Sequence, residues 1–415
     1  LEQAAAVATS ALETAKIPSK EWFESQGNVS AVVSNWSELK AALDSGKTGN
    51  IVIYGNITAE DQIVLKDGQN LVGVGYYGVS EPDTDKFSQI NIDLEKFGLT
   101  DGIKAQADNL LISDISIKAV TRKSVHSHVI NFANTSNHIL QNVDILMDNS
   151  EQDDFNQNTS AQSIAIYSGS HIGVYGVNSI SEAKASAVSV YSYGIAESGI
   201  DIFGQLNINI LQSVSSAIVY TNLNVENNAT LNIVSKSRGI WNGVSNFNGN
   251  AIINIDAKYA LMYGTHNVND KSVLNVKAED FLYSYKSNID YNIVLNVNSA
   301  AAKVNVNASK QLFSNSGNTT TFNAVSGSQM SVNGKVYRAD GAVNDNTMNG
   351  NNMPTGFVEV EGAVAEPVPS LDWLIEQNAN RSMGYDYKNE AEESGKQYAG
   401  ILSQYDSIIK DSSYK

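Results

Sequence analysis

The stretch that decides the fold is residues 217–297, "AIVYTNLNVENNATLNIVSKSRGIWNGVSNFNGNAIINIDAKYALMYGTHNVNDKSVLNVKAEDFLYSYKSNIDYNIVLNV". Apolar residues return in it at steps of 22, 21 and 21 residues, at Ile218, Ile240, Leu261 and Leu282. Two further columns keep similar steps: Val225, Phe247, Val268 and Ile289, and then Ile233, Ile255, Val276 and Val297. A unit of this length cannot bury its own apolar face, so successive copies must stack and share one core. The repeat therefore predicts a solenoid.

The composition narrows the classes of partner. The chain has 415 residues, with 27 basic against 44 acidic side chains and a net charge of −17. Nucleic acid and anionic membranes require a cationic face, so we expect neither as a partner. No cysteine is present, which is compatible with a secreted bacterial protein. No apolar run reaches the roughly 18 residues that span a bilayer, so we expect no direct membrane insertion in this segment.

Local patterns divide the chain into four parts. Asn35 and Glu38 have the spacing of a helix N-cap with its capping-box partner. A proline-bearing run, 365–369, precedes an apolar helical pattern at the C-terminus. The predicted parts are an N-terminal helical cap (1–47), a β-solenoid (48–340), a linker (341–369) and a C-terminal helical segment (370–415).

The C-terminal segment needs a surface to cover its apolar side. A short helix after Ser370 carries Leu371, Leu374 and Ile375, and a second amphipathic pattern follows it. Because the last coil of a solenoid must be covered, we favour folding back over the coils. Association with another chain stays open.

Residues Asn35–Gly75 read "NWSELKAALDSGKTGNIVIYGNITAEDQIVLKDGQNLVGVG", a helix followed by two strands that end in glycine-rich turns. This order resembles the first coil of the pectin-lyase-like right-handed parallel β-helix superfamily. The resemblance implies an all-β solenoid, a single-stranded right-handed parallel β-helix with short helical caps at both termini. It leaves the activity open, because the superfamily includes lyases, glycoside hydrolases, phage tailspikes and adhesin or autotransporter passenger domains.

The enzymes of that superfamily suggest where catalytic residues would lie. The Trp-Ile-Asp-His signature of its pectate lyases has no counterpart here. Its polygalacturonases carry an Asp-Asp pair and a Gly-His element, which Asp153, Asp154 and His171 resemble. If the chain is an enzyme, these three are its catalytic residues. We favour no catalytic set, because Asp153 and Asp154 fall in a polar insertion.

Two pairs of residues are candidates for metal binding. His126 and His128 are two residues apart, so on a strand they would share one face. Asp83 and Asp85 supply hard oxygen ligands for calcium in a neighbouring loop. Neither pair has the spacing of a defined motif. We therefore expect no cofactor, with calcium as the one open possibility.

Two columns of the regular coils suit ligand binding. One asparagine per coil would form a ladder at the strand spacing of roughly 4.8 Å, at Asn232, Asn254, Asn275 and Asn296. Beside the Ile218 column, an outward stripe is predicted at Val219, Trp241, Met262 and Tyr283. Such a stripe suits a sugar polymer or a protein surface, and it equally suits burial under the C-terminal helices.

These observations favour a secreted or cell-surface bacterial protein, adhesin-like, that binds carbohydrate or a cell-surface protein through a β-helix face. Self-association is a further possible use of the same face. The alternative is a polysaccharide lyase or glycoside hydrolase that acts on an acidic polysaccharide, with its groove beside the uneven coils of residues 101–210. A structural spacer without a ligand is the second alternative.

Overall fold

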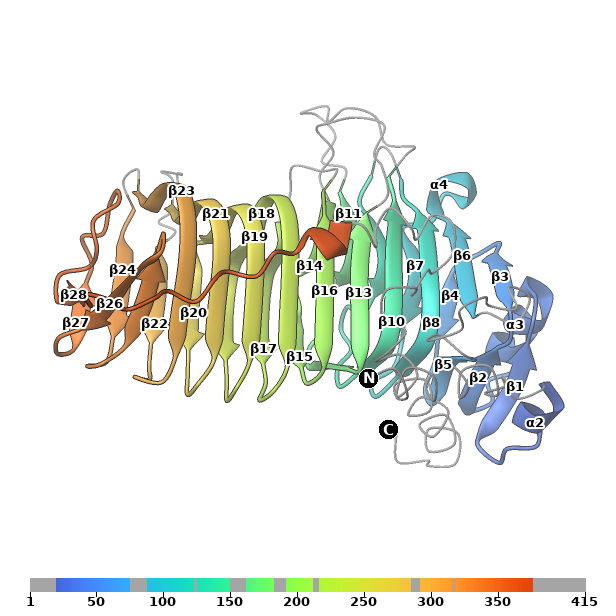
Figure 1. Ribbon diagram of the computed structural model, residues 1–415. Coiled ribbons are helices and arrows are strands. Elements are labelled where there is room, and N and C mark those ends of the chain that lie inside the picture. Colours follow the sequence, from blue (N-terminus) through green and yellow to red (C-terminus); the bar gives the residue numbers. More distant parts are fainter. Residues whose placement is uncertain are drawn as a thin grey trace, which may run out of the picture.

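The computed structural model describes residues 20–74, 88–122, 125–149, 162–182, 192–211, 216–284, 292–315 and 318–375. Within these ranges the regular structure is mostly β-strand, and all strand pairs between β1 and β25 are parallel. Figure 1 shows the strands side by side in one elongated stack, with α2 and α3 at its N-terminal, blue end.

The labelled helices are α2 (Lys20–Glu24), α3 (Trp36–Asp44) and α4 (Leu94–Phe97), and residues 372–375 form one further helical turn, where the sequence predicts a short helix after Ser370. The first strands are β1 (Val29–Val33), β2 (Gly49–Ile53), β3 (Asn56–Ala59), β4 (Ile63–Leu65), β5 (Gln69–Gly73), β6 (Gln89–Asp93), β7 (Asp101–Ala105), β8 (Leu111–Val120), β9 (Ser127–Asn131) and β10 (Ile139–Asp148). The central strands are β11 (Ser163–Tyr167), β12 (Ile172–Tyr175), β13 (Val177–Glu182), β14 (Ser192–Ala196), β15 (Gly199–Ile202), β16 (Gln205–Ile210), β17 (Ser216–Val225), β18 (Thr230–Phe247) and β19 (Ile252–Met262). The last strands are β20 (Gly264–Val268), β21 (Val273–Ser284), β22 (Ile293–Val297), β23 (Lys303–Asn315), β24 (Thr320–Ala324), β25 (Gln329–Val332), β26 (Lys335–Ala339), β27 (Val343–Asp345) and β28 (Phe357–Glu359).

Three series of parallel pairs run along the stack. The first passes from β10 through β13, β16, β18, β19, β21 and β23 to β25. The second passes from β7 through β9, β11, β14 and β17 to β18. The third passes from β12 through β15, β17, β18, β20 and β22 to β24. Long strands such as β18 belong to more than one series, so each coil of chain contributes to every face.

The predicted repeat is confirmed in its first column. Ile218, Ile240, Leu261 and Leu282 are successive register partners, and none has exposed surface. The coil after β20 is longer, however, and Val268 pairs with Val297 rather than with Ile289. Val276 pairs with Val306 in turn. The predicted places of Ile289 and Val297 were therefore wrong, and Ile289 lies outside the described residues.

The N-terminal cap begins as its sequence predicts. The Asn35 Oδ1 atom accepts a hydrogen bond from the Glu38 backbone N–H at 3.0 Å, at the start of α3. The Glu38 carboxylate accepts one from the Ser34 backbone N–H at 2.8 Å. This hydrogen bond is the main reason that the pKa of Glu38 is lowered. Leu39 and Leu43 pack into the core, so α3 covers the first coil.

The C-terminal end departs from the predicted linker over residues 341–369. The Asn333-Gly334 turn joins β25 and β26 as an antiparallel hairpin, with φ of 48° and 86° at the two turn residues. Within the predicted linker, β27 pairs with β24 and β28 pairs with β26, all antiparallel. These strands continue the sheet beyond the last parallel coil, so much of this region is folded.

Residues 360–375, here called the tail strap, run back across the stack (Figure 1). Lys303 pairs with Glu366, and Leu371 and Leu374 pack against Val234 of β18. The Asn209 amide of β16 donates a hydrogen bond to the Leu374 carbonyl oxygen at 2.8 Å. The predicted fold-back is therefore confirmed up to residue 375, beyond which the structure is not described.

Candidate functional site

The predicted Trp241 stripe exists as a column but is largely buried. Val219, Trp241, Met262 and Tyr283 are successive register partners. Val219 and Met262 are only 2% and 1% exposed, whereas Trp241 and Tyr283 are half-buried. A flat, open apolar platform was therefore the wrong expectation for Val219 and Met262. The described part of the tail strap packs elsewhere, against Val234 and Leu211.

The asparagine ladder is present with one different member. The side-chain amides of Asn232, Asn254, Asn275 and Asn305 each donate to the asparagine one coil earlier, at 2.7–2.9 Å, beginning at Asn207. Its members are buried, so they bind one another rather than a ligand. Asn296 is not in this ladder, because the longer coil after β20 moves it to the next face.

Asn296 belongs to a second ladder that begins at a carboxylate. The Asn224 amide donates to Asp201 Oδ1 at 2.6 Å, and Asn246, Asn267, Asn296 and Asn323 continue the chain one coil at a time. All these amides donate in the same direction, so their dipoles point their positive ends toward Asp201. Aligned hydrogen bonds strengthen one another in a low dielectric. The ladder therefore stabilises and positions the Asp201 carboxylate.

Asp201 faces an open cleft of about 500 Å³, which lies between the turns that follow β11 and β14 and the second half of β17. Its other carboxylate oxygen, Oδ2, lies 3.8 Å from His171 Nδ1. The cleft is lined by Asp108, Asn134, Thr135, Ser136, Ser168, Gly169, Ser170, His171, Glu197, Ser198, Gly199, Asp201, Tyr220, Asn222 and Asn224. We call it the His171 cleft. Its described walls are rich in hydroxyls, amides and carboxylates, and they contain no lysine or arginine.

The cleft walls hold several side chains on strained backbone. Ser168, His171, Glu197 and Tyr220 have φ of 57°, 54°, 53° and 47°, in the left-handed region that non-glycine residues avoid. Ser168, Glu197 and Tyr220 follow aligned residues on successive coils, so the strain recurs at one corner. Such strain costs about 1–3 kcal/mol per residue and gathers at functional sites. It presents the Tyr220 ring, which is 39% exposed, at the rim of the cleft.

Glu197 is oriented by residues beneath the cleft. Its Oε2 atom accepts a hydrogen bond from the Tyr167 hydroxyl at 3.1 Å. The Tyr167 ring stacks on His128 at 4.2 Å, and the His128 Nδ1 atom lies 2.7 Å from Asp101 Oδ1. Burial, followed by the Glu197 charge, raises the pKa of Tyr167, which therefore stays a hydrogen-bond donor at neutral pH.

The predicted metal and catalytic residues do not assemble. His128 is buried against Asp101, while His126 is exposed. In the described part of the chain, no three His, Asp or Glu side chains form a group that could hold a metal ion. Asp83, Asp85, Asp153 and Asp154 lie outside the described residues. Of the proposed catalytic set, only His171 can be placed, and its described carboxylate neighbour is Asp201.

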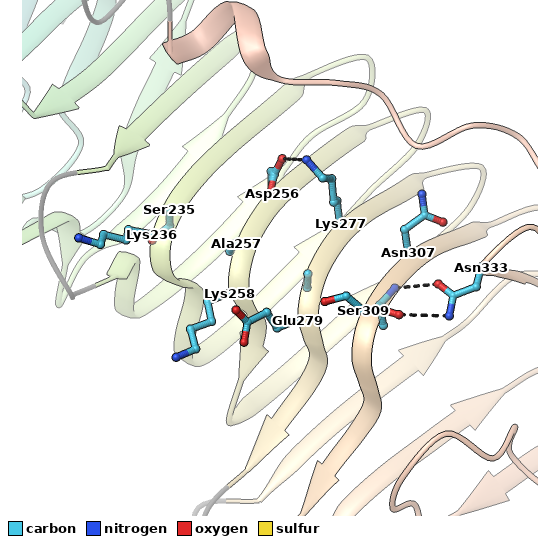
Figure 2. Close-up of a pocket in the computed structure, with 12 residues that line it drawn as sticks. Ser235, Lys236, Asp256, Ala257, Lys258, Lys277, Glu279, Asn307, Ser309 and Asn333 are labelled. Atoms are coloured by element: carbon cyan, nitrogen blue, oxygen red, sulfur yellow. Dashed lines mark hydrogen bonds and ion pairs between the residues drawn. The ribbon is translucent and has the colours of Figure 1, made fainter.

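A second hollow, about 590 Å³, crosses the outer edge of β18, β19, β21 and β23 (Figure 2). Its floor is made of small residues, including Ala257, Ala278 and Ala308, where the strands bend. Figure 2 shows the Lys277–Asp256 ion pair, 2.9 Å long, and the hydrogen bonds of Asn333 across it. Its lining includes Lys236, Lys258 and Lys277, so this hollow differs in charge from the His171 cleft.

No family model matches the chain, and no curated protein or solved structure matches it either. Among the residues described, no helix has the length and apolar character needed to cross a membrane.

Proposed function

We propose that this protein is a secreted or cell-surface bacterial carbohydrate-binding protein, adhesin-like in character, built as a right-handed parallel β-helix of the pectin-lyase-like type. The parallel register, repeated every 21 or 22 residues through β17, β18, β19 and β21, supports the architecture. The observation that carries the function is the His171 cleft: an open cleft lined by oriented polar side chains, with one exposed aromatic ring.

The chemistry of the cleft suits sugars. Carboxylates such as Asp201 and Glu197 accept hydrogen bonds from sugar hydroxyls, and both are already oriented by neighbouring side chains. Charge-assisted hydrogen bonds of this kind are the stronger ones. The exposed Tyr220 ring supplies an apolar face for a pyranose ring. With Asp108, Glu197 and Asp201 in its walls, the cleft favours a neutral sugar over consecutive acidic ones.

A panel of neutral and acidic oligosaccharides tests the proposal by titration calorimetry. We expect binding of neutral ligands, with affinity lowered at least tenfold in Asp201→Asn and in Tyr220→Ala. Glu361→Gln, which removes an exposed carboxylate far along the chain, is the matched control and should bind as the wild type does. Absence of binding across the panel, or cleft variants that bind normally, would contradict the proposal. Cleavage of a ligand would favour the hydrolase or lyase alternative.

A further inference from the structure

Four buried donor atoms on the paired strands β17 and β18 have no acceptor among the described residues. They are Ser216 Oγ, Arg238 Nε and Nη1, and Trp241 Nε1; all are buried, and none has a hydrogen-bond partner among the described residues. Ser216 and Arg238 are register partners on neighbouring strands. The Arg238 guanidinium lies 4.5 Å from the centroid of the Trp241 ring. The unpaired donors therefore form one cluster.

Such a cluster is unfavourable in the free protein. A buried donor without a partner costs about 1–3 kcal/mol, and more when the group is charged. No described carboxylate pairs with Arg238, although acidic residues far outnumber basic ones in the chain. The cation–π contact with Trp241 orients the guanidinium but supplies no hydrogen-bond acceptor. An anionic group that entered the cluster would satisfy several donors at once.

Aromatic rings border the cluster on two sides. Tyr259 is the next register partner of Arg238, and its ring stacks on Tyr283 at 4.0 Å. On the other side, Tyr220 lies 5.2 Å from Trp241 and also lines the His171 cleft. Arg238, Trp241 and Tyr259 are half-buried, so each still presents some surface. The cluster is therefore joined to the cleft through Tyr220.

We propose that this cluster is a subsite for one anionic sugar residue, whose carboxylate or sulfate group binds Arg238, Ser216 and the Trp241 indole N–H. The planar guanidinium fits either group through paired hydrogen bonds. The pyranose ring packs on Tyr220 or Tyr259. Because the neighbouring cleft carries three carboxylates, the ligand has one anionic residue beside neutral ones. That it is a carbohydrate rests on the proposed function; the anion site rests on the donor cluster.

The Trp241 indole N–H gives a direct readout. The chain has four tryptophans, and Trp241→Phe assigns the indole signal in a ¹H–¹⁵N spectrum. We expect glucuronate and glucose 6-sulfate, added separately, to shift this signal, and glucose to leave it unchanged. Arg238→Gln should abolish the shift, while Arg238→Lys, which keeps the charge without the planar fork, should weaken binding at least fivefold. Arg338→Gln, an exposed arginine of β26, is the matched control.

The outcomes separate the two proposals. A shift with either anion that needs Arg238 supports the subsite even if no oligosaccharide binds the His171 cleft. If only one of the two anions produces it, that anion is the group recognised. Equal responses to glucose and to the anions, or an unchanged response in Arg238→Gln, would overturn the subsite while leaving neutral-sugar binding to be judged by Asp201→Asn.

Discussion

At the scale of single residues, the least ordinary side chain outside the cleft is Asp114. It lies in β8 with φ of 55° and is 1% exposed. Its Oδ1 atom accepts a hydrogen bond from the Asn142 amide at 2.8 Å, while Oδ2 has no partner among the described residues. Burial raises the pKa of Asp114 to about 7. The folded protein therefore favours the protonated carboxyl group.

This shift predicts a particular pH dependence of stability. The folded pKa exceeds the unfolded one, so the folded state binds more protons between about pH 4 and pH 7. The contribution of Asp114 to the free energy of unfolding is fully present below about pH 4. It is lost as the pH rises to 7, and the loss is on the order of a few kcal/mol. The buried His138 and His266, whose pKa values are lowered to about 4, act in the opposite direction, so the contribution of Asp114 is the difference between two proteins. The urea denaturation midpoint of the wild type should fall relative to that of Asp114→Asn as the pH rises across this range. An unchanged slope in Asp114→Asn, or a changed one in the exposed control Glu60→Gln, would contradict this.

Substitution of His171 should stabilise the folded protein and weaken its binding of sugar. Its side chain is 75% exposed and its φ is 54°, a conformation that asparagine tolerates better. We expect His171→Asn to raise the free energy of unfolding by about 0.5–1 kcal/mol and to weaken neutral-sugar binding. Calorimetric titration and thermal melts measure the two effects. The exposed His126, substituted in the same way, should change neither.

The residues of the cleft were only partly predictable. The sequence names His171 only for the case that the chain is an enzyme, together with Asp153 and Asp154, because the three resemble the Asp-Asp and Gly-His elements of polygalacturonases. Asp201 was missed because it is an aspartate at the head of a column of asparagines. The asparagines follow it at steps of 23, 22 and 21 residues, at Asn224, Asn246 and Asn267. Following that column backwards would have found it. The Arg238 cluster has no sequence signal, because an unsatisfied donor is defined only by its surroundings.

At the scale of elements, local signals were more reliable than the predicted register of the later coils. The Asn35 cap was predicted because it depends on a few neighbouring residues, and the Asn333-Gly334 turn rests on an equally local pattern. The predicted position of Asn296 was wrong because the coil before it carries an insertion. Counting at a constant step beyond that longer coil assigns the later residues to the wrong face. The tail strap crosses the stack without a periodic pattern, so its path follows from packing alone.

The tail strap should be released by one substitution. Leu374 is 3% exposed and packs against Val234, whereas its neighbour Ile375 is 42% exposed. Leu374→Asp would bury an uncompensated charge, so we expect the strap to detach and its peptide bonds to become sensitive to limited proteolysis. Ile375→Asp is the matched control and should cleave as the wild type does. Equal cleavage rates in the two variants would show that Leu374 does not hold the strap.

At the scale of the whole molecule, the 21-residue step is the property that the sequence reports most directly. It is visible because each coil repeats the same inward positions, and the structure confirms it from Ile218 to Leu282. Handedness is not encoded in that step. The resemblance of Asn35–Gly75 supplies it as an expectation.

A stack built from equivalent coils should tolerate the loss of one. Tyr259 is the register partner of Asp280, so deleting residues 260–280 removes one coil and joins Tyr259 to Phe281, the residue that follows Asp280. All three faces then stay in register, so we expect a folded protein shorter by roughly 4.8 Å. Small-angle scattering and circular dichroism measure length and strand content. Deleting only residues 260–269 breaks the register and should abolish cooperative folding; a folded half-coil variant would contradict the argument.

The tail strap also decides where the molecule would yield under tension. Its last described contact joins Leu374 to Asn209, 165 residues earlier in the chain. A pull applied beyond residue 375 therefore reaches the stack first at β16 and β18 and not at the exposed end strand β28. The load is carried across the strands as shear on the Leu371 and Leu374 contacts before any coil can peel away. In the adhesin-like role proposed above, this attachment point would make the strap the first part to give way and the coils the last.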